Sequence, residues 1–429
     1  MKREESMMNE ARKVANQILA SSRLLPLQIF IRAKRGALVR FTNNGIHQSG
    51  FQDLFTYTLH LLGQEGPVYL ESNDGSNVGI QEALKRIRAL VSKPIPFPKS
   101  GKSVYAKIKE HFPLTIERIP MMAAQAIEQG IDLIRGKQAS ANGYFSAYER
   151  SFYFKDSKGL ELFHPATAVR FGVTVTRGGG KGYHSFYHAD PKKLNVASVI
   201  KEASELAQAA SSREVSVKPG VYECIFHPRA FLELIEPIRP HSDRELYQNG
   251  KSAFSSLLGQ RIFSKAFTLS EDITHSQQFG VPFDVEGMPK KKVALIERGV
   301  LKGLLGEGNS MRGISEHPVY PQNLVAEGGN LALQSLFKGI RNGIFINKVR
   351  YHTLVREKGL KVTGLVTAGS LSIEKGRVLG RVGHLRYHDS LMSLLGSVIN
   401  QTKERVLLKD GEGGAALLPY FLISRLRVV

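Results

Sequence analysis

Cysteine and tryptophan are nearly absent from this sequence of 429 residues, which holds one cysteine and no tryptophan. The single cysteine, Cys224, cannot form an internal disulfide, and it excludes a zinc module built on clustered cysteines. Long apolar segments are also missing, because the run Ala415–Ile423 is far shorter than the roughly 20 residues of a membrane-spanning helix. Residues Met1–Met8 carry charges and do not resemble a secretory leader. We therefore expect a cytoplasmic protein without membrane association.

Positive charge, by contrast, is in excess. Lysine and arginine number 59 against 38 aspartate and glutamate, a net charge of +21, and the pI is near 9.9. Such a chain attracts polyanions at low salt. The basic residues are dispersed in short groups such as Lys290–Lys292 and Arg425–Arg427, and no run reaches the length of a basic tail. Two interpretations stay open, a generally cationic surface and a dedicated nucleic-acid-binding face.

The first half of the chain shows the pattern helix, strand, strand, helix twice, at about residues 8–91 and 121–210. Apolar residues at helical spacing predict helices over residues 11–19, 80–91, 123–134 and 196–207. Alternating or strand-forming residues predict strands over 27–31, 38–41, 144–154 and 169–176, with turns at Asn43–Gly45 and Asp156–Gly159. The alternation at 169–176 predicts a strand with one face in solvent.

The character of the chain changes after the polar segment Ser211–Gly220, which we interpret as a domain boundary. Beyond it, one helix is expected near Ala230–Glu236, followed mainly by short strands separated by glycines. The predicted fold class is α+β: an N-terminal domain (1–214) of helices packed on an antiparallel sheet, and a β-rich C-terminal domain (215–429).

Several segments, in order along the chain, share a recognisable pattern. Arg40–Gln48 forms a hairpin motif, and Ala141–Gly143 precedes an aromatic strand. The most specific segment is Asp284-x-Glu-Gly followed by Leu-Ile-Glu-x-Gly-Val-Leu at 295–301. Looser matches follow at 321–324, 328–329, 351–355, 363–364, 373–376 and 418–425. Together they resemble the TldD/PmbA (modulator of DNA gyrase) family of peptidases from about residue 8 to the C-terminus, and in particular its PmbA (TldE) branch.

The resemblance implies a protein that acts in proteolysis or peptide maturation through a TldD–PmbA pair, in which the TldD-like subunit carries a metal ion, expected to be zinc. TldD-type members share a His-Glu-x-x-x-His helix, whose imidazoles bind the metal and whose carboxylate activates water. At the matching step this chain has His227-Pro228-Arg229, and it holds no His-Glu dipeptide. It also lacks the metal-associated cysteine after His388. We therefore expect no catalytic and no metal-binding residue in this chain, and whether it is an enzyme stays open.

Two other pairs of histidines have a spacing that metal sites can use. His184 and His188, with Asp190 behind them, and His384 with His388 each follow His-x-x-x-His. Both pairs lie in strand-like contexts, where such residues share a face but are about 13 Å apart at ~3.3 Å per residue. Exposed or hydrogen-bonded histidines are therefore favoured. The glycine-rich segments 177–182 and 303–308 lack a nucleotide-binding context and favour flexible hairpins.

The favoured hypothesis is a non-catalytic PmbA/TldE-like subunit that pairs with a TldD-like chain, or forms a homodimer, and helps to bind a peptide or small protein. The alternatives are an autonomous metal-dependent hydrolase, for instance through His184, His188 and Asp190, and a nucleic-acid-binding module. We expect the cleft to be lined by polar residues at the motif-bearing turns, namely Asp284, Glu286, Asn323, Arg350, Tyr351 and His352. Asp284 and Glu286 could act as an acid–base pair, fix a turn or contact a partner.

Overall fold

The computed structural model describes residues 2–22, 25–97, 103–306, 322–357, 359–367, 369–410 and 414–429. In the first half, every predicted helix and strand is found. The elements are α1 (Lys2–Ser21), β1 (Gln28–Thr42), β2 (Gly45–Gly63), β3 (Gly66–Ser72), α2 (Asn77–Leu90), α3 (Ile119–Asp132), β4 (Ala139–Asp156), β5 (Glu161–Arg177), β6 (Gly180–His188) and α4 (Val196–Ala210), with short 3₁₀ turns at Ile116–Arg118 and Pro191–Lys193.

The strands of the first half form one antiparallel sheet in the order β3-β2-β1-β4-β5-β6. The predicted strands 27–31 and 38–41 are both parts of β1, so β2 and β3 were not predicted in the first unit, and β6 was not predicted in the second. The observed repeat is helix, three strands, helix, and the two units meet where β1 pairs with β4. The β1–β2 hairpin turns at Asn43 and Asn44, whose φ angles are +47° and +63°. Asparagine tolerates this left-handed backbone, which matches the twist of the strands.

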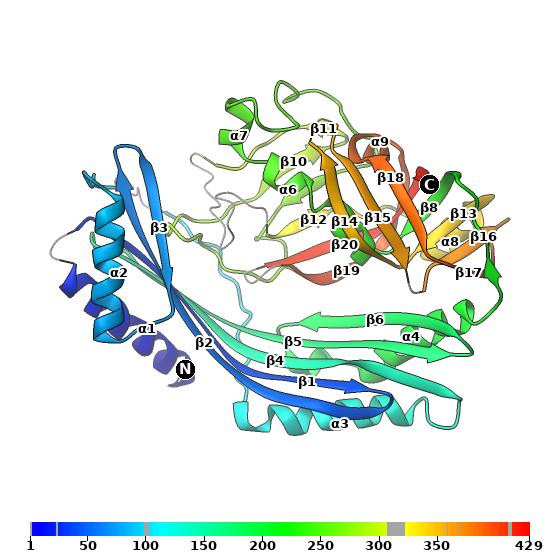
Figure 1. The fold of residues 1–429 in the computed structure, drawn as a ribbon, viewed down its shortest axis with the longest axis horizontal. Coiled ribbons are helices and arrows are strands. Elements are labelled where there is room, and N and C mark those ends of the chain that lie inside the picture. Colours follow the sequence, from blue (N-terminus) through cyan, green and yellow to red (C-terminus); the bar gives the residue numbers. More distant parts are fainter. Residues whose placement is uncertain are drawn as a thin grey trace.

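The four helices cover one face of this sheet. Helices α1 and α2 pack on one end, around Ile29 and Leu59, while α3 and α4 pack on the other end, around Phe145 and Phe171. Figure 1 shows α1 and α2 at the left end of the curled sheet and α3 beneath it, with the C-terminal half of the chain above.

The opposite face of the sheet packs against the C-terminal half. Phe30 and Phe154 contact Phe283 and Val285 in one apolar cluster, and Ala168 and Tyr187 contact Ala415 in another. The face of 169–176 that was predicted to be in solvent is half-exposed at Arg170, Thr174 and Thr176, while Ala168, just before this segment on the same face, is covered by the second half of the chain. The strand itself and its apolar face were predicted correctly.

The C-terminal half is rich in strands, as predicted, and the fold class α+β is confirmed. Its helices are α5 (Pro228–Ile235), α6 (Ile238–His241), α7 (Arg244–Gln248), α8 (Leu333–Gly339) and α9 (Leu391–Gly396). Its strands are β7 (Glu214–Val215), β8 (Gly220–Phe226), β9 (Leu269–Glu271), β10 (Val293–Glu297), β11 (Val300–Leu301), β12 (Leu324–Ala326), β13 (Asn342–Ile346), β14 (Lys348–Arg356), β15 (Lys361–Thr367), β16 (Leu371–Glu374), β17 (Arg377–Val382), β18 (Leu385–Ser390), β19 (Val398–Asp410) and β20 (Gly414–Val428).

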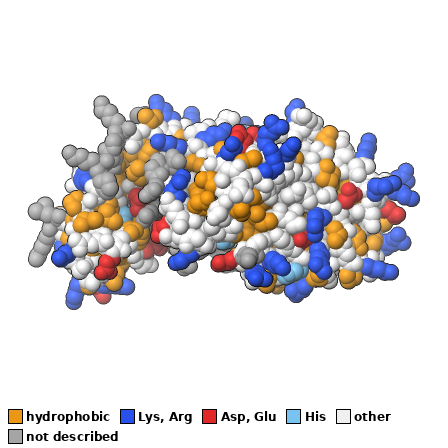
Figure 2. All heavy atoms as spheres, turned by 90° about the horizontal axis from the view of Figure 1, so that it is seen from above, with side chains coloured by type: hydrophobic (Ala, Val, Ile, Leu, Met, Phe, Trp, Pro, Cys, Tyr) orange, Lys and Arg blue, Asp and Glu red, His pale blue; other side chains and the backbone are white. Residues whose placement is uncertain are grey.

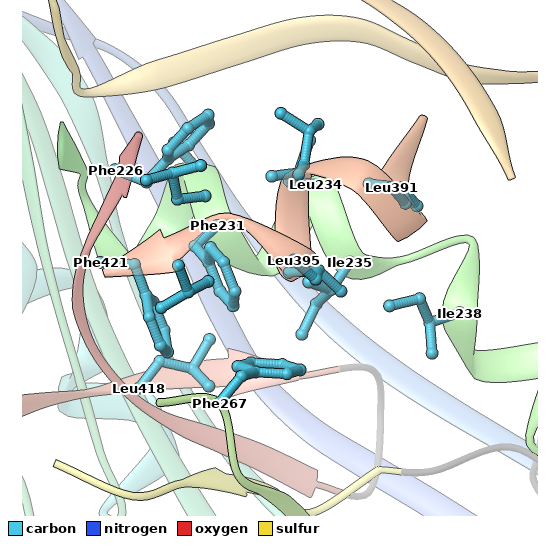
Figure 3. Packing of buried hydrophobic residues seen from close by; sticks show 14 of the residues in the cluster. Phe226, Phe231, Leu234, Ile235, Ile238, Phe267, Leu391, Leu395, Leu418 and Phe421 are labelled. Carbon is cyan, nitrogen blue, oxygen red and sulfur yellow. The ribbon is translucent and has the colours of Figure 1, made fainter. Parts of the chain in front are cut away.

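These strands form a second, branched sheet with β20 at its centre. Strand β20 pairs with β8, β18 and β19 in antiparallel fashion and with β12 in parallel. Helix α5 packs on it, and Figure 3 shows Phe231 of α5 against Phe421 of β20. The two rings are stacked with centroids 3.9 Å apart. This cluster is the main core of the second half.

We retain the division at residues 214 and 215 as our proposal for the domain boundary. Strands of the first sheet end at His188, and the second sheet includes β7 from Glu214.

No helix in the described part of the chain combines the length and apolar character needed to cross a membrane. Lysine and arginine side chains are spread over the face seen in Figure 2, between hydrophobic and acidic groups.

Candidate functional site

The candidate site lies where β8 ends and α5 begins, facing strand β6 of the first sheet. His227 is the N-cap of α5, and its Nδ1 accepts a hydrogen bond from the backbone N–H of Arg229 over 3.1 Å. Pro228 occupies the first turn of the helix, where the missing N–H costs nothing. The imidazole of His227 is 1% exposed, and its Nε2 has no hydrogen-bond partner among the described residues.

Aromatic rings surround His227. The ring centroid of Tyr420 is 5.0 Å away, and that of His184 on β6 is 6.3 Å away. Burial, followed by the nearby charge of Arg229, lowers the pKa of His227 well below its ordinary value. The same two causes lower the pKa of His184 to about 4. Both imidazoles are therefore neutral near pH 7.

Arg229 connects α5 to the first sheet. Its Nη2 donates a hydrogen bond to Oγ of Ser185 over 3.0 Å, and its guanidinium lies over the ring of Tyr183, 4.4 Å from the centroid. The ammonium of Lys348, at the start of β14, lies 4.7 Å from the centroid of the same ring. On neighbouring strands, Arg170 lies over the ring of Tyr144 at 5.2 Å. Cations over aromatic faces are attracted by the ring quadrupole.

These side chains border a pocket of about 240 Å³ between the two sheets. The pocket is lined by strands β4, β5 and β6, by α5, and by residues 407–409 of β19. Its charged lining residues include Arg170, Arg229 and Glu233, and its apolar wall includes Leu232 and Leu407. The pocket therefore combines cationic, aromatic and apolar surfaces contributed by both halves of the chain.

Titratable groups in the pocket respond to burial and to the cations. Burial raises the pKa of the Glu233 carboxyl, in part against the lowering effect of Lys348 and Arg229. Burial alone would raise the pKa of the Tyr183 phenol, but Arg229, Lys348 and the hydrogen bonds with Tyr144 and Ser185 lower it overall. Burial therefore disfavours the ionised form of Glu233, whereas the neighbouring cations favour the ionised form of Tyr183.

The residues at this step do not fit the divalent metal that the family resemblance implies for active members. One nitrogen of His227 already caps α5. The guanidinium of Arg229, two residues later in the chain, would repel a divalent metal ion bound at this point. Among the described residues, no three His, Cys, Asp or Glu side chains gather as metal ligands. We derive no chemistry through a metal in this chain.

The six cleft residues expected from the sequence lie in separate environments. Asp284 is buried, and its Oδ1 accepts hydrogen bonds from the backbone N–H groups of Glu286 and Met288, each over 2.9 Å. Glu286 accepts a hydrogen bond from the Tyr69 hydroxyl, and its Oε1 lies 3.7 Å from Nε2 of His60. Of the roles considered, Asp284 has the turn-fixing one, while Glu286 contacts the first sheet.

The other expected residues are no closer to a common cleft. Asn323 is fully buried, and its amide donates to the carbonyl oxygen of Phe279 over 2.8 Å. Arg350, Tyr351 and His352 lie on β14, where Tyr351 is 77% exposed and Nδ1 of His352 lies 2.7 Å from the Tyr387 hydroxyl.

The histidine pairs also separate. His184 and His188 lie on strand β6, as predicted. His184 approaches His227 rather than its neighbour in the pattern, while Nδ1 of His188 accepts from the backbone N–H of Asp190. The glycine-rich segment 177–182 forms the β5–β6 hairpin, and Gly308 of the second glycine-rich segment lies outside the described residues.

Sequence reasoning noted His227 but missed Arg229, Tyr183 and Lys348. The sequence signal was present in part, since Arg229 stands beside a proline that opens a helix. Tyr183 and Lys348 come from other strands, and no local spacing relates them to α5.

The arrangement of the elements recurs in solved structures. TldE from Thermococcus kodakarensis has a TM-score of 0.80 at 18% identity, covering 97% of this chain and 99% of its own. A putative modulator of DNA gyrase from Thermotoga maritima has a TM-score of 0.79 at 18% identity, with 97% and 100% covered. A third structure, a putative modulator of DNA gyrase from Bacteroides thetaiotaomicron, also has a TM-score of 0.79, at 15% identity, with 98% of each chain covered. These likenesses show that the chain has the fold of the TldE and gyrase-modulator structures.

Residues 219–429 match the PmbA/TldA metallopeptidase C-terminal domain. Two relatives named metalloproteases, from Methanothermobacter thermautotrophicus and Methanocaldococcus jannaschii, are 25% and 26% identical over 58% and 57% of this chain. The matches span 59% and 56% of those relatives, a little over half of their length. The C-terminal half of the chain is therefore a PmbA/TldD-type C-terminal domain, in agreement with the family resemblance of the sequence motifs.

Proposed function

We propose that this chain is a PmbA/TldE-like, non-catalytic subunit of a TldD/PmbA-type metallopeptidase complex in the cytoplasm. A TldD-like partner supplies the metal ion, expected to be zinc, and this chain helps to bind a peptide or small protein. The observation that carries the proposal is the start of α5. There His227 serves as a helix cap, and the next residues are Pro228 and Arg229, so no carboxylate follows the histidine as it does in the metal-binding helix.

Hydrolysis of a peptide bond by a metal needs several ligands around the ion and a base for the bound water. Here the second residue of the helix is a buried cation whose pKa burial lowers, so positive charge at this point is already costly. Adding a divalent ion beside it would increase that cost. The residues of this chain are therefore suited to hold and orient a ligand, and the hydrolytic step belongs to the partner.

The edges of the two sheets support a role in binding an extended peptide. Strand β6 is the last strand of the first sheet, and both β6 and β19 contribute to the pocket wall. The edge of a sheet offers backbone donors and acceptors to an added strand. A peptide along this edge would pass beside the side chains of Tyr183 and Ser185.

Co-purification tests the proposal. The chain and a TldD-like protein from the same organism are expressed together, one of them tagged, and the complex is analysed for metal content and peptidase activity. We expect a complex that contains metal and cleaves peptides. For this chain alone, we expect both the metal content and the peptidase activity to be near background. Stoichiometric zinc and peptidase activity in the isolated chain, both abolished by His227→Ala, would refute it and favour an autonomous hydrolase.

The net charge of +21 keeps nucleic-acid binding as the alternative to be measured. A DNA-binding module loses affinity steeply as salt rises. Absence of binding to duplex DNA at about 50 mM salt would eliminate that alternative. Steeply salt-dependent binding would favour it over the peptidase subunit.

A further inference from the structure

Three cations lie at the pocket between the two sheets: Arg170 and Arg229 line it, and Lys348 lies over the ring of Tyr183 at its border. In the described part of the chain, no carboxylate oxygen lies within 4.0 Å of a side-chain nitrogen of Arg170, Arg229 or Lys348. Other arginines on the first sheet and its helices are paired, for example Arg12 with Glu161 at 2.6 Å. Glu233 interacts with Arg229 and Lys348 only from beyond ion-pair distance. A partly buried cluster of cations compensated at that range is unfavourable, because the charges repel and have lost part of their hydration.

Aromatic rings compensate for only part of this cost. Tyr183 lies against both Arg229 and Lys348, and Tyr144 lies against Arg170. Each guanidinium group donates one hydrogen bond to a neighbouring hydroxyl, Arg170 to Tyr144 over 3.2 Å and Arg229 to Ser185 over 3.0 Å. Nη1 of Arg229 is buried and has no partner among the described residues. A planar acceptor that takes two parallel N–H donors would fit a guanidinium group.

The size and walls of the pocket limit what can enter. Its volume of about 240 Å³ corresponds to roughly eight water molecules at ~30 Å³ each, and is below the ~300 Å³ at which sites for drug-sized ligands begin. The pocket therefore suits one residue rather than a whole ligand. Leu232, Leu407 and Leu408 line it together with the cations, so a small apolar group bearing an anionic end matches both kinds of surface.

We propose that this pocket binds a carboxylate group of a peptide, with the guanidinium groups of Arg229 and Arg170 as its main contacts and Lys348 adding positive charge. The inference rests on the proposed function in one respect only, that the ligand is a peptide. The one carboxylate in the lining, Glu233, lies beyond ion-pair distance of the three cations and leaves them available.

Calorimetric titration of the full chain with matched peptides tests the inference. The probes are N-acetyl tri-alanine with a free C-terminal carboxylate, the same peptide as a C-terminal amide, N-acetyl Ala-Ala-Glu amide, and inorganic phosphate. We expect the free carboxylate to bind at least about tenfold more tightly than the tri-alanine amide. If the glutamate peptide binds as tightly as the free acid, the site accepts a side-chain carboxylate as well as a C-terminal one. That result would also support the proposed site.

Variants assign the binding to the pocket. Arg229→Met keeps the length of the side chain without its charge and should reduce the advantage of the carboxylate peptide by about tenfold. Arg386→Met, which removes an exposed arginine of β18, is the control and should leave it unchanged. Because Arg229 is partly buried, Arg170→Met provides a second test if the first variant is unfolded by circular dichroism. Three results would overturn the inference. The free-acid and amide peptides could bind with equal affinity, the Arg386→Met control could lose as much affinity as Arg229→Met, or phosphate could bind while the peptides do not.

The result is independent of the TldD-like partner, since the titration uses the isolated chain. Failure to co-purify with a partner would refute the subunit assignment and leave the difference between acid and amide intact. Loss of that difference in a chain that still forms the complex would overturn only the carboxylate site.

Discussion

The backbone N–H of Arg229 donates a hydrogen bond to Nδ1 of His227, two residues earlier in the chain, and this bond begins α5. The histidine that would be a metal ligand in an active relative is therefore a helix cap here. Its consequences can be measured.

Replacing His227 distinguishes its role as a helix cap from a role as a metal ligand. His227→Ala removes an N-cap, worth about 1 kcal/mol, and leaves a cavity at a buried ring, so we expect a total loss of about 2–3 kcal/mol in the free energy of unfolding. His227→Asn keeps a capping oxygen and should recover about 1 kcal/mol of that loss. Urea denaturation measures both. A loss that depends on added zinc would contradict the capping role.

Acid should destabilise the chain through His184. Its folded pKa of about 4 lies below the ordinary value of 6.5, so the unfolded state binds the proton more tightly and stability falls as pH drops from about 6.5 towards 4. Between pH 7 and pH 5 this one group contributes a loss of roughly 1–2 kcal/mol. His184→Gln should flatten the profile of unfolding free energy against pH by that amount. An unchanged slope would mean that the histidine titrates normally in the folded chain.

Asp284 should act through structure rather than catalysis. Its Oδ1 accepts from the N–H groups of Glu286 and Met288, and Asp284→Ala leaves these donors without their acceptor at a cost of about 2–3 kcal/mol. Asp284→Asn retains an acceptor oxygen and should cost about 1 kcal/mol or less. Thermal and urea unfolding give the comparison. If instead the complex with a TldD-like chain lost activity equally in both variants at full stability, a chemical role would be indicated.

The stack of Phe231 on Phe421 should be a major contributor to the core around α5. Both rings are nearly inaccessible to solvent, so Phe231→Ala should lower the free energy of unfolding by about 3–5 kcal/mol. Phe231→Leu keeps most of the volume and should cost about 1–2 kcal/mol, chiefly through the lost ring contact. Denaturant midpoints measure the difference, and equal costs for the two variants would contradict this packing.

The sequence predicts the first half of the fold well because periodicity reports burial directly. Ala11, Ala15 and Ile18 recur at helical spacing, and all three lie on the buried face of α1. The solvent face predicted for 169–176 is half-exposed, but alternation does not reveal the second layer, which covers the start of β5 at Ala166 and Ala168. Short helices such as α9 were not predicted, since a helix of six residues is too short to show a period.

The site is harder to predict than the fold. The change at His227 is visible in the sequence because it alters a local motif. The pocket places Arg229 of the second half beside Tyr183 of the first sheet, and Lys348 lies over the same ring. These contacts form only when the two halves of the chain pack together. Such contacts have no spacing signature in a single sequence.

The central position of β20 has a consequence for synthesis of the protein. Strand β8 emerges from the ribosome about 200 residues before the strand that pairs with it along its length, since Phe226 pairs with Phe421 and Gly220 pairs with Val428. Until then, the apolar strand β8 lacks this neighbour and the core beneath α5 stays open. Long-range pairing of this kind slows folding and leaves strand edges exposed to aggregation. The nascent chain should therefore depend on chaperones through the whole second half of its translation.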